Sequence, residues 1–350
     1  MGAQPIAIGT ERLVGRGHPA LVVAEIGQNH NGSPELAEQL IDAAAWAGAD
    51  AVKLVKRDLA SELSLEARGQ PYNGEHAFGP TYGEHRRALE LPDDVHAALC
   101  RRARRHGLAL IGTPCDAVST KLFMSLGVDA LKIASRDLEN TPLVDGVATL
   151  GAPILLSTGM SSFDEIDAAV GLLRHRGAEF LLLHCTSLYP TPADQVHLRS
   201  LAAMAARYDA PVGFSDHTIG ILIAPIAASW GAVVIEKHLT LDRRQRGTDH
   251  ACSLEPDALR TMIDHVRKAE AALGRDDKPL AAGVQRVRNK LGRSLVVNVP
   301  LEPGAQLAEE MLSLKCPGDG LTWRDRHLLI GRRVRRQLAA DQKLSLEDVD

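Results

Sequence analysis

The sequence predicts an α/β protein whose main domain is a (β/α)8 TIM barrel, followed by a small, mostly-β domain. Three observations support this prediction: short apolar runs recur along the first 240 residues, amphipathic stretches separate them, and the pattern changes after Gly274. Nearly continuous apolar runs are typical of parallel strands buried on both faces. Strands of this kind that alternate with helices are typical of a barrel.

The eight expected strands share an apolar sequence that ends in a polar residue. They are residues 20–27, 50–55, 108–113, 129–135, 152–158, 179–185, 210–215 and 232–238. Their spacing of roughly 20–30 residues suits βαβ units, except for a longer gap after the second strand. An open doubly wound sheet is the alternative, but it would favour a GxGxxG turn after the first strand, and EIGQNHNG lacks that spacing.

Amphipathic stretches between the runs predict helices. In the first of them, Ser33 is a candidate N-cap and Gly48 a stop signal. The gap over 56–92 is rich in Gly, Pro and His, which predicts an active-site loop insertion. The expected helices are residues 33–48, 93–107, 161–177 and 255–274.

The sequence after the last long helix predicts a second domain. Pro and Gly there close short extended runs instead of barrel-type helices. We expect a barrel over 1–280, a linker over 281–292 and the small domain over 293–350. About 58 residues alone would be marginally stable, so this domain is expected to lean on something larger.

Composition excludes several classes of protein. Lys and Arg number 40 against 44 Asp and Glu, a net charge of −4 that argues against a nucleic-acid partner. The five cysteines form no CxxC pair, which disfavours a disulfide framework or a zinc ribbon. No signal-peptide pattern opens the sequence and no apolar run approaches the ~20 residues that span a bilayer. We therefore expect a cytoplasmic protein without a membrane partner.

The polar residues at the expected strand ends predict the site, because working residues of such barrels lie there. Two lysines with several hydroxyls suit a small polyanion such as a phosphate ester with a carboxylate. A pair of histidines on neighbouring strands can hold a divalent metal. These residues are Glu25, Lys53, Thr113, Lys132, Ser135, Ser157, Ser215, His217, Glu236 and His238.

Each of these residue types also has a structural interpretation. Paired lysines can bridge the layers of a barrel, and single hydroxyls at strand ends often only donate hydrogen bonds. Cys115 and Cys185 could be nucleophiles, but small buried cysteines more often fill space, and the sequence assigns no base to them.

Five motifs in order resemble the sialic acid (N-acetylneuraminate) synthase family, whose members condense phosphoenolpyruvate with an amino sugar or a related aldose. The resemblance extends from about residue 18 to the C-terminus, because LVVNVPLEPGAQL and KCPGDGL resemble the antifreeze-like (SAF, β-clip) domain of that family. The five motifs are AEIGQNHNG (24–32), LSTGM (156–160), HCTSLYPTP (184–192), GFSDHT (213–218) and EKHLT (236–240).

The resemblance implies a divalent metal, Mn2+ or Mg2+, on His217 and His238. It also implies a homodimer in which the small domain of one chain reaches over the barrel mouth of the other. Glu25 matches an acidic residue near the metal, and Ser187 stands where relatives commonly carry Asn. The implied phosphoenolpyruvate site comprises Lys53, Thr113, Lys132, Ser135, Ser157, Ser187 and Ser215, and the implied sugar site comprises Asp137, Tyr189, Asp249 and Cys316.

The expected reaction joins C3 of phosphoenolpyruvate to an aldose aldehyde, adds water at C2 and releases phosphate by C–O cleavage. Either Glu25 or Asp249 would manage the proton of the water. Three departures concern the sugar: Cys316 replaces an Arg, Asp137 a Glu and Val55 a Gln. The condensation is therefore expected with a sugar that can differ from N-acetylmannosamine.

Two other classes of function stay open at this point. A metal-dependent hydrolase on the same barrel would usually carry an HxH pair after the first strand, where this chain has QNH. A non-catalytic carbohydrate-binding protein descended from a synthase would have little reason to keep two lysines and two histidines at the strand ends.

Overall fold

The computed structural model describes residues 3–9, 12–275 and 277–350. The chain forms two compact units, Met1–Gly274 and Arg275–Asp350, and each is described by itself. The division falls close to residue 280, where the sequence places the end of the barrel.

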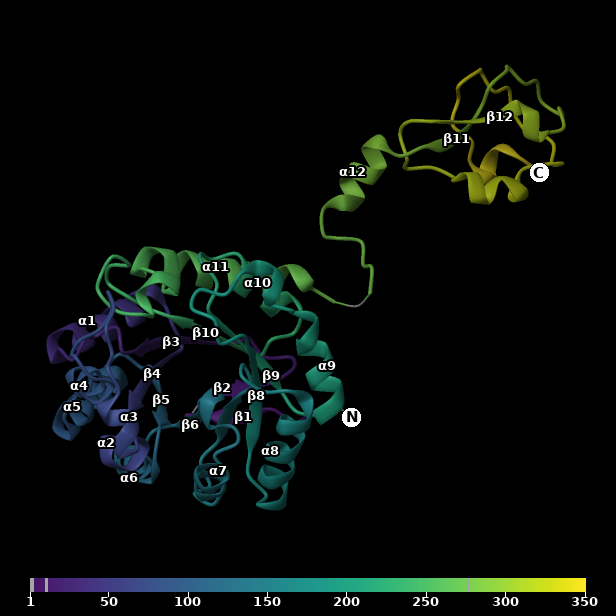
Figure 1. The fold of residues 1–350 in the computed structure, drawn as a ribbon. Helices are drawn as coiled ribbons and strands as arrows, with labels where there is room; N and C mark the ends of the chain where they lie inside the picture. Colours follow the sequence, from purple (N-terminus) through teal and green to yellow (C-terminus); the bar gives the residue numbers. More distant parts are fainter. Residues whose placement is uncertain (1–2, 10–11, 276) are drawn as a thin grey trace. The chain divides into compact units, whose positions relative to one another are not determined.

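The first unit is a closed barrel of eight parallel strands, which confirms the predicted fold (Figure 1). Each strand overlaps one of the expected apolar runs. Neighbours in sequence are neighbours in the barrel, and the last strand closes on the first. The strands are β3 (Leu21–Gly27), β4 (Ala51–Lys56), β5 (Ala109–Pro114), β6 (Ala130–Ile133), β7 (Ile154–Ser157), β8 (Phe180–Cys185), β9 (Val212–Asp216) and β10 (Val234–His238).

Helices surround the barrel (Figure 1), and their apolar faces pack against the outward side chains of the strands. All four predicted helices are present. The surrounding helices are α1 (Pro34–Ala47), α5 (Asp93–Arg105), α6 (Ala117–Ser125), α7 (Thr141–Ala148), α8 (Phe163–His175), α9 (Arg199–Tyr208), α10 (Ile223–Ser229) and α11 (Pro256–Leu273). Short 3-10 turns interrupt the loops at η1 (Ser135–Asp137), η2 (Ala193–Gln195) and η3 (His250–Cys252).

Local sequence fixes the ends of α1 as predicted. The Ser33 side chain accepts a hydrogen bond from the Leu36 amide, which satisfies one free donor of the first turn. Gly48 ends the helix at φ 87°, a left-handed conformation that a residue with a Cβ rarely adopts. The sequence therefore sets both boundaries of this helix.

A hairpin that the sequence analysis did not predict closes the base of the barrel. Strands β1 (Ile6–Ile8) and β2 (Arg12–Val14) pair antiparallel. Their apolar side chains join the inward residues of the barrel strands in one core cluster, which includes Leu21 and Val23 of β3. Three-residue strands are too short to show a periodicity.

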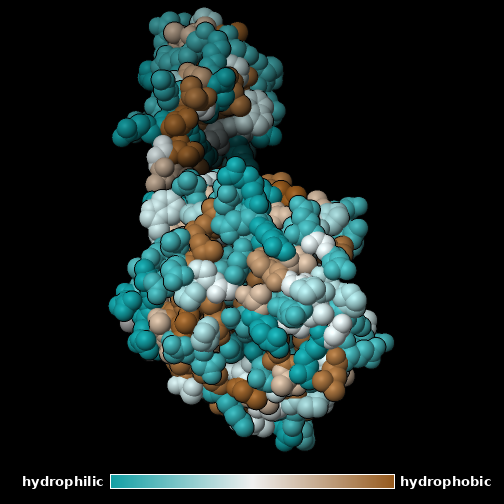
Figure 2. Space-filling model, turned by 60° about the vertical axis from the view of Figure 1, so that its left-hand side comes forward, coloured by the Kyte–Doolittle hydropathy of each residue, from teal (hydrophilic) through white to brown (hydrophobic). Residues whose placement is uncertain are grey.

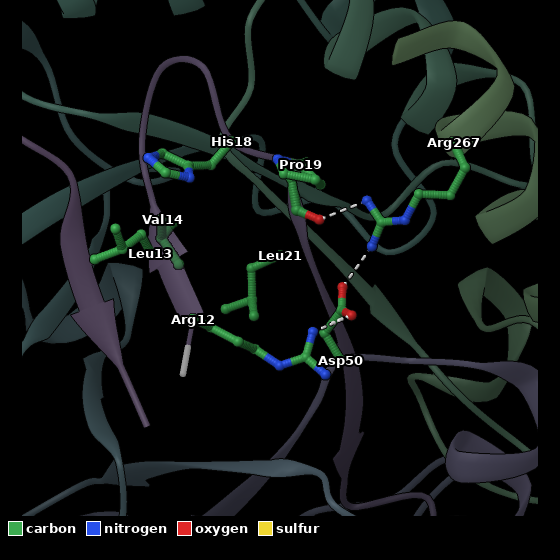
Figure 3. A pocket seen from close by; sticks show the side chains of 9 residues that line it. Arg12, Leu13, Val14, His18, Pro19, Leu21, Asp50 and Arg267 are labelled. Atoms are coloured by element: carbon green, nitrogen blue, oxygen red, sulfur yellow. Dashed lines mark hydrogen bonds and ion pairs between the residues drawn. The ribbon is translucent and has the colours of Figure 1, made fainter. Parts of the chain in front are cut away.

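A cavity of about 380 Å3 lies at this base, beside the hairpin (Figure 3). Asp50 links three segments there, because it contacts the Arg12 guanidinium and accepts hydrogen bonds from Arg267 Nη2 (2.6 Å) and the Val22 amide (2.8 Å). The base of a barrel is where residues serve stability. We therefore interpret this cavity as a structural feature of the hairpin attachment.

The insertion after β4 is built from short helices, where the sequence predicted a loop. They are α2 (Leu59–Glu62), α3 (Leu65–Gly69) and α4 (Tyr82–Ala88). Thr81 and Glu84 form a capping box at the start of α4, and Tyr72 stacks on His85 with ring centroids 4.4 Å apart. Caps and stacking order this segment beside β4, the strand that carries Lys53.

The second unit has its own apolar core, which includes Leu295, Leu338 and Val349. Helix α12 (Val284–Leu291) lies inside the range expected to be a linker, and β11 (Ser294–Val297) pairs antiparallel with β12 (Leu312–Lys315). Three 3-10 turns complete the unit: η4 (Glu309–Met311), η5 (Trp323–Leu328) and η6 (Leu346–Asp348).

The surface mixes residue types. Figure 2 shows hydrophilic residues over most of the visible face, with hydrophobic ones interspersed. Within the described residues, no helix has both the length and the apolar composition that crossing a membrane requires.

Candidate active site

Three neighbouring strands place titratable groups at one level of the barrel. In the register, His238 of β10 pairs with Glu25 of β3, and Glu25 pairs with Lys53 of β4. A register shift follows between Glu25 and Gly27. All three side chains are buried near the carboxyl ends of their strands, where barrel enzymes carry their catalytic groups.

Glu236 holds the two predicted lysines together. Its Oε1 lies 2.8 Å from Lys53 Nζ and 2.9 Å from Lys132 Nζ, and it accepts a hydrogen bond of 2.8 Å from Ser215 Oγ. Lys53 also contacts Glu25 Oε2. Burial alone would raise the pKa of Glu236, but Lys132 and Lys53 hold that pKa well below its ordinary value. One ionised carboxylate thus fixes the two lysine side chains beside each other. Burial lowers the pKa of Lys53 well below its ordinary value, whereas Glu236 raises that of Lys132.

His217 and His238 come together as predicted, with ring centroids 5.5 Å apart. Burial, with the neighbouring His238, lowers the pKa of His217 to about 3, and burial with Lys53 lowers that of His238 to about 3. Both rings are therefore neutral at pH 7. Asp216 and Lys237 form a fully buried ion pair (3.0 Å) that links β9 to β10.

These residues fit a divalent cation. The Nδ1 of His217 lies 2.9 Å from the Thr186 carbonyl oxygen, an arrangement that makes Nδ1 the donor and leaves Nε2 with a free lone pair. Buried Nδ1 of His238 and buried Oε1 of Glu25 have no hydrogen-bond partner. Among the described residues, no group of three or more potential ligands is already assembled. The chain would thus supply two imidazoles and leave positions open, as catalytic sites do.

Asp249 and Tyr189 lie beside the histidines. Asp249 Oδ2 is 3.9 Å from His238 Nδ1, and Asp249 directly precedes η3. The Tyr189 ring lies 4.1 Å from that of His217 between centroids, and the residue is 45% exposed. Tyr189 also lines the pocket, so its phenol can offer a hydrogen bond there.

Three predicted hydroxyl residues gather around the backbone of Gly159, which follows β7. A Cβ at Gly159 would lie 2.5 Å from Cys185 Sγ, 2.7 Å from Ser187 Oγ and 3.1 Å from Ser135 Oγ. The Gly159 amide donates to Ser135 Oγ (3.0 Å), and Ser157 Oγ lies 4.0 Å from Cys185 Sγ. Only glycine leaves room for this convergence of the ends of β6, β7 and β8.

A pocket of about 110 Å3 lies at the mouth of the barrel. Thr113 is among its lining residues, and its buried hydroxyl has no hydrogen-bond partner. The predicted site residues that line the pocket are Glu25, Lys53, Thr113, Lys132, Tyr189, His217, His238 and Asp249.

The other predicted site residues do not line this pocket. Ser215 binds Glu236, and Asp137 faces Arg136, whose Nε lies 3.4 Å from its Oδ2. Cys316 is an exposed residue after β12 in the second unit, beside Arg293. Ser135, Ser157 and Ser187 belong to the cluster around Gly159.

The sequence analysis did not single out two arginines as site residues, and it gave Glu236 no role beyond its place at a strand end. Arg57 and Arg136 line the pocket, and Glu236 organises the lysines. A signal was present for Arg57, which follows Lys53 by four residues at the end of β4, because side chains four residues apart share a face of a strand. No such signal marked Arg136, which lies in the 3-10 turn η1 after β6.

Glu90 contacts the Arg57 guanidinium, and its burial predicts a pH dependence of stability. Burial raises its pKa from 4.5 to about 7. Because the folded state binds the proton of the Glu90 carboxyl group more tightly than the unfolded state does, this proton stabilises the fold. The stabilisation is complete below pH 4.5 and is lost as the pH rises to about 7. Relative to the wild type, Glu90→Gln is expected to gain up to about 3 kcal/mol of unfolding free energy between pH 4.5 and 8. Urea unfolding at both pH values measures this gain, and parallel pH profiles would contradict it.

The fold and site define a class: a (β/α)8-barrel enzyme whose mouth combines a lysine pair for anions with two neutral histidines. Comparison with known proteins makes the assignment specific. Residues 40–278 match the NeuB family, and residues 292–350 match the SAF domain. The chain belongs to the NeuB family, which confirms the resemblance to sialic acid synthases.

Relatives of the chain span its whole length. It is 35% identical to the human N-acetylneuraminate-9-phosphate synthase, over 97% of this chain and 95% of that protein. It is 34% identical to the N,N'-diacetyllegionaminic acid synthase of Legionella pneumophila, over 94% of each. The crystal structure of N-acetylneuraminic acid synthetase from Leptospira borgpetersenii, in complex with citrate, superposes with a TM-score of 0.72 at 31% identity, covering 82% of this chain and 95% of that one. The chain therefore belongs to a family that includes synthases of several nonulosonic acids.

Proposed function

We propose that this protein condenses phosphoenolpyruvate with an aldose to give a 2-keto-3-deoxy sugar acid and inorganic phosphate. The observation that carries this proposal is the joint placement of Lys53, Lys132, His217 and His238 at one barrel mouth. Lysine pairs suit a ligand with both a carboxylate and a phosphate. Neutral imidazoles suit a cation that faces the aldehyde.

In the proposed reaction, C3 of phosphoenolpyruvate forms a bond with the aldehyde carbon, whose oxygen takes up a proton and becomes a hydroxyl. Water adds at C2, and phosphate departs with the bridging oxygen. Lys53 and Lys132 hold the enol phosphate, and the hydroxyls around Gly159 orient it. A Mn2+ or Mg2+ ion on His217 and His238 would supply a Lewis acid for the carbonyl oxygen.

The proton of the attacking water needs an acceptor. Glu25 and Asp249 both line the pocket, and Glu25 Oε1 is buried without a hydrogen-bond partner. Lys53, in contact with Glu25 Oε2, keeps this carboxylate oriented. We propose these two carboxylates as the candidate bases.

The relatives carry names with different sugar acids, so membership of the family leaves the acceptor open. N-acetylmannosamine or a related amino- or deoxy-hexose fits the proposal. The homodimer with exchanged small domains stays a prediction, which light scattering of the full chain tests.

The test is phosphate release by the full chain with Mn2+, phosphoenolpyruvate and a panel of hexoses and hexosamines. Release is expected only when both substrates are present. With 18O at the bridging oxygen of phosphoenolpyruvate, C–O cleavage places the label in the phosphate. Release without an aldose would indicate a hydrolase, and label in the sugar acid would contradict C–O cleavage.

A further inference from the structure

Two guanidinium groups line the same pocket as the lysine pair, and they come from the segments that follow β4 and β6. Lys53, Val55 and Arg57 alternate along one strand and its end, and all three line the pocket. Lys132 of β6, Ala134 after it and Arg136 of η1 line the pocket as well. Both lysines lie within their strands and both arginines follow the carboxyl ends, so the arginines lie nearer the mouth than the lysines.

The two arginines form one unit. Glu62 bridges them, with its Oε2 3.2 Å from Arg57 Nε and its Oε1 3.2 Å from Arg136 Nη2. Cys115 Sγ, at the end of β5 between the two strands, is 2.8 Å from Arg136 Nη2 and 3.9 Å from Arg57 Nη2. These contacts hold the two guanidinium groups side by side.

The carboxylates that hold these arginines do not line the pocket. Glu62, Glu90 and Asp137 contact the guanidinium groups, but only the arginines belong to the pocket wall. Arg57 is 3% exposed, and its Nη1 has no hydrogen-bond partner. A buried charged donor without an acceptor is costly, and a bound anion would satisfy it.

The order of strands in the barrel indicates which part of the acceptor the arginines face. His217 and His238, proposed to face the aldehyde, lie on β9 and β10, whereas the arginines follow β4 and β6. In the proposed reaction, the lysine pair already binds the enol phosphate. The arginines therefore face the part of the acceptor that is remote from its aldehyde carbon.

We propose that the acceptor aldose carries an anionic group, a phosphate ester or a carboxylate, at the end remote from the aldehyde, and that Arg57 and Arg136 bind it. This inference rests on the proposed condensation. Planar guanidinium forks bind both kinds of anion in a bidentate manner, which lysines cannot do.

The test compares three acceptors that differ only at C6: N-acetylmannosamine, its 6-phosphate and the corresponding uronic acid. Calorimetric titration and kcat/KM are measured for the wild type, Arg136→Gln and Arg57→Lys. The Arg136 side chain is 40% exposed, so its replacement should fold. Arg176→Gln, which removes an exposed arginine paired with Asp145 on the outer helices, is the matched control.

We expect the wild type to prefer either the 6-phosphate or the uronic acid over N-acetylmannosamine by at least about 10-fold. The preferred acceptor then identifies the anionic group. Arg136→Gln should reduce that preference by about 10- to 100-fold, and Arg57→Lys should also reduce it, because charge-assisted hydrogen bonds are lost. The control should match the wild type.

Three results would overturn the inference: a wild-type preference for the neutral sugar, an equal loss for all three acceptors in Arg136→Gln, or a loss confined to phosphoenolpyruvate binding. If no aldose is condensed, the proposed function fails. Calorimetry still decides the inference in that case: arginine-dependent binding of the charged sugars supports it, and absence of binding overturns it.

Discussion

Replacement of His217 or His238 by alanine is expected to lower kcat/KM by about 10^3-fold or more in the presence of Mn2+, because each ring supplies one of the two imidazoles that line the pocket among the described residues. The two centroids are 5.5 Å apart and both rings are neutral at pH 7, so loss of one leaves a single imidazole for the cation. Binding of Mn2+, measured by calorimetry without substrates, should fall in the same variants.

His265→Ala is the matched control, since His265 is an exposed residue of α11. It should bind Mn2+ and turn over as the wild type does. Circular dichroism and thermal unfolding establish that the His217 and His238 variants are folded. Full activity with unchanged Mn2+ binding in either variant would refute the metal assignment.

Replacement of Lys132 by methionine is expected to lower kcat/KM for phosphoenolpyruvate by about 10^2- to 10^3-fold. Methionine keeps much of the side-chain length but removes the charge that lies 2.9 Å from Glu236 Oε1. Glu236 would then pair with Lys53 alone, and one of the two cations for the anionic substrate is gone. The affinity for the aldose should change far less.

Lys268→Met tests whether loss of any lysine has this effect, because Lys268 is an exposed residue of α11 paired with Asp264. Its kinetics should equal those of the wild type. Isothermal titration with phosphoenolpyruvate and with the aldose separates the two affinities. Equal losses for both substrates in Lys132→Met would contradict the proposed division of the site.

The barrel was predictable because its local signals agree with its global structure. Buried parallel strands require nearly continuous apolar runs, and all eight runs became strands of the closed barrel. Caps such as Ser33 and Gly48 fixed helix ends through local hydrogen bonds and backbone conformation. The N-terminal hairpin and α12 lack comparable signals, since one is very short and the other has a polar, basic sequence.

The site was predictable only in part. Strand ends identified Lys53, Lys132, His217 and His238, because all carboxyl ends of parallel strands meet at one rim. Which strand-end residues line the pocket was not predictable, so Ser135, Ser157, Ser187 and Ser215 were grouped with residues that do. Glu236 became the organising carboxylate only through its contacts with both lysines.

By itself, the sequence determined the barrel, the second domain and which residue types meet at the mouth, since these follow from hydrophobic pattern and strand direction. The tertiary structure alone decided which charges touch. Strand register put Glu25 between His238 and Lys53, and β5 brought Cys115 between Arg57 and Arg136. Such contacts depend on register and side-chain packing between strands far apart in the chain, which no local pattern encodes.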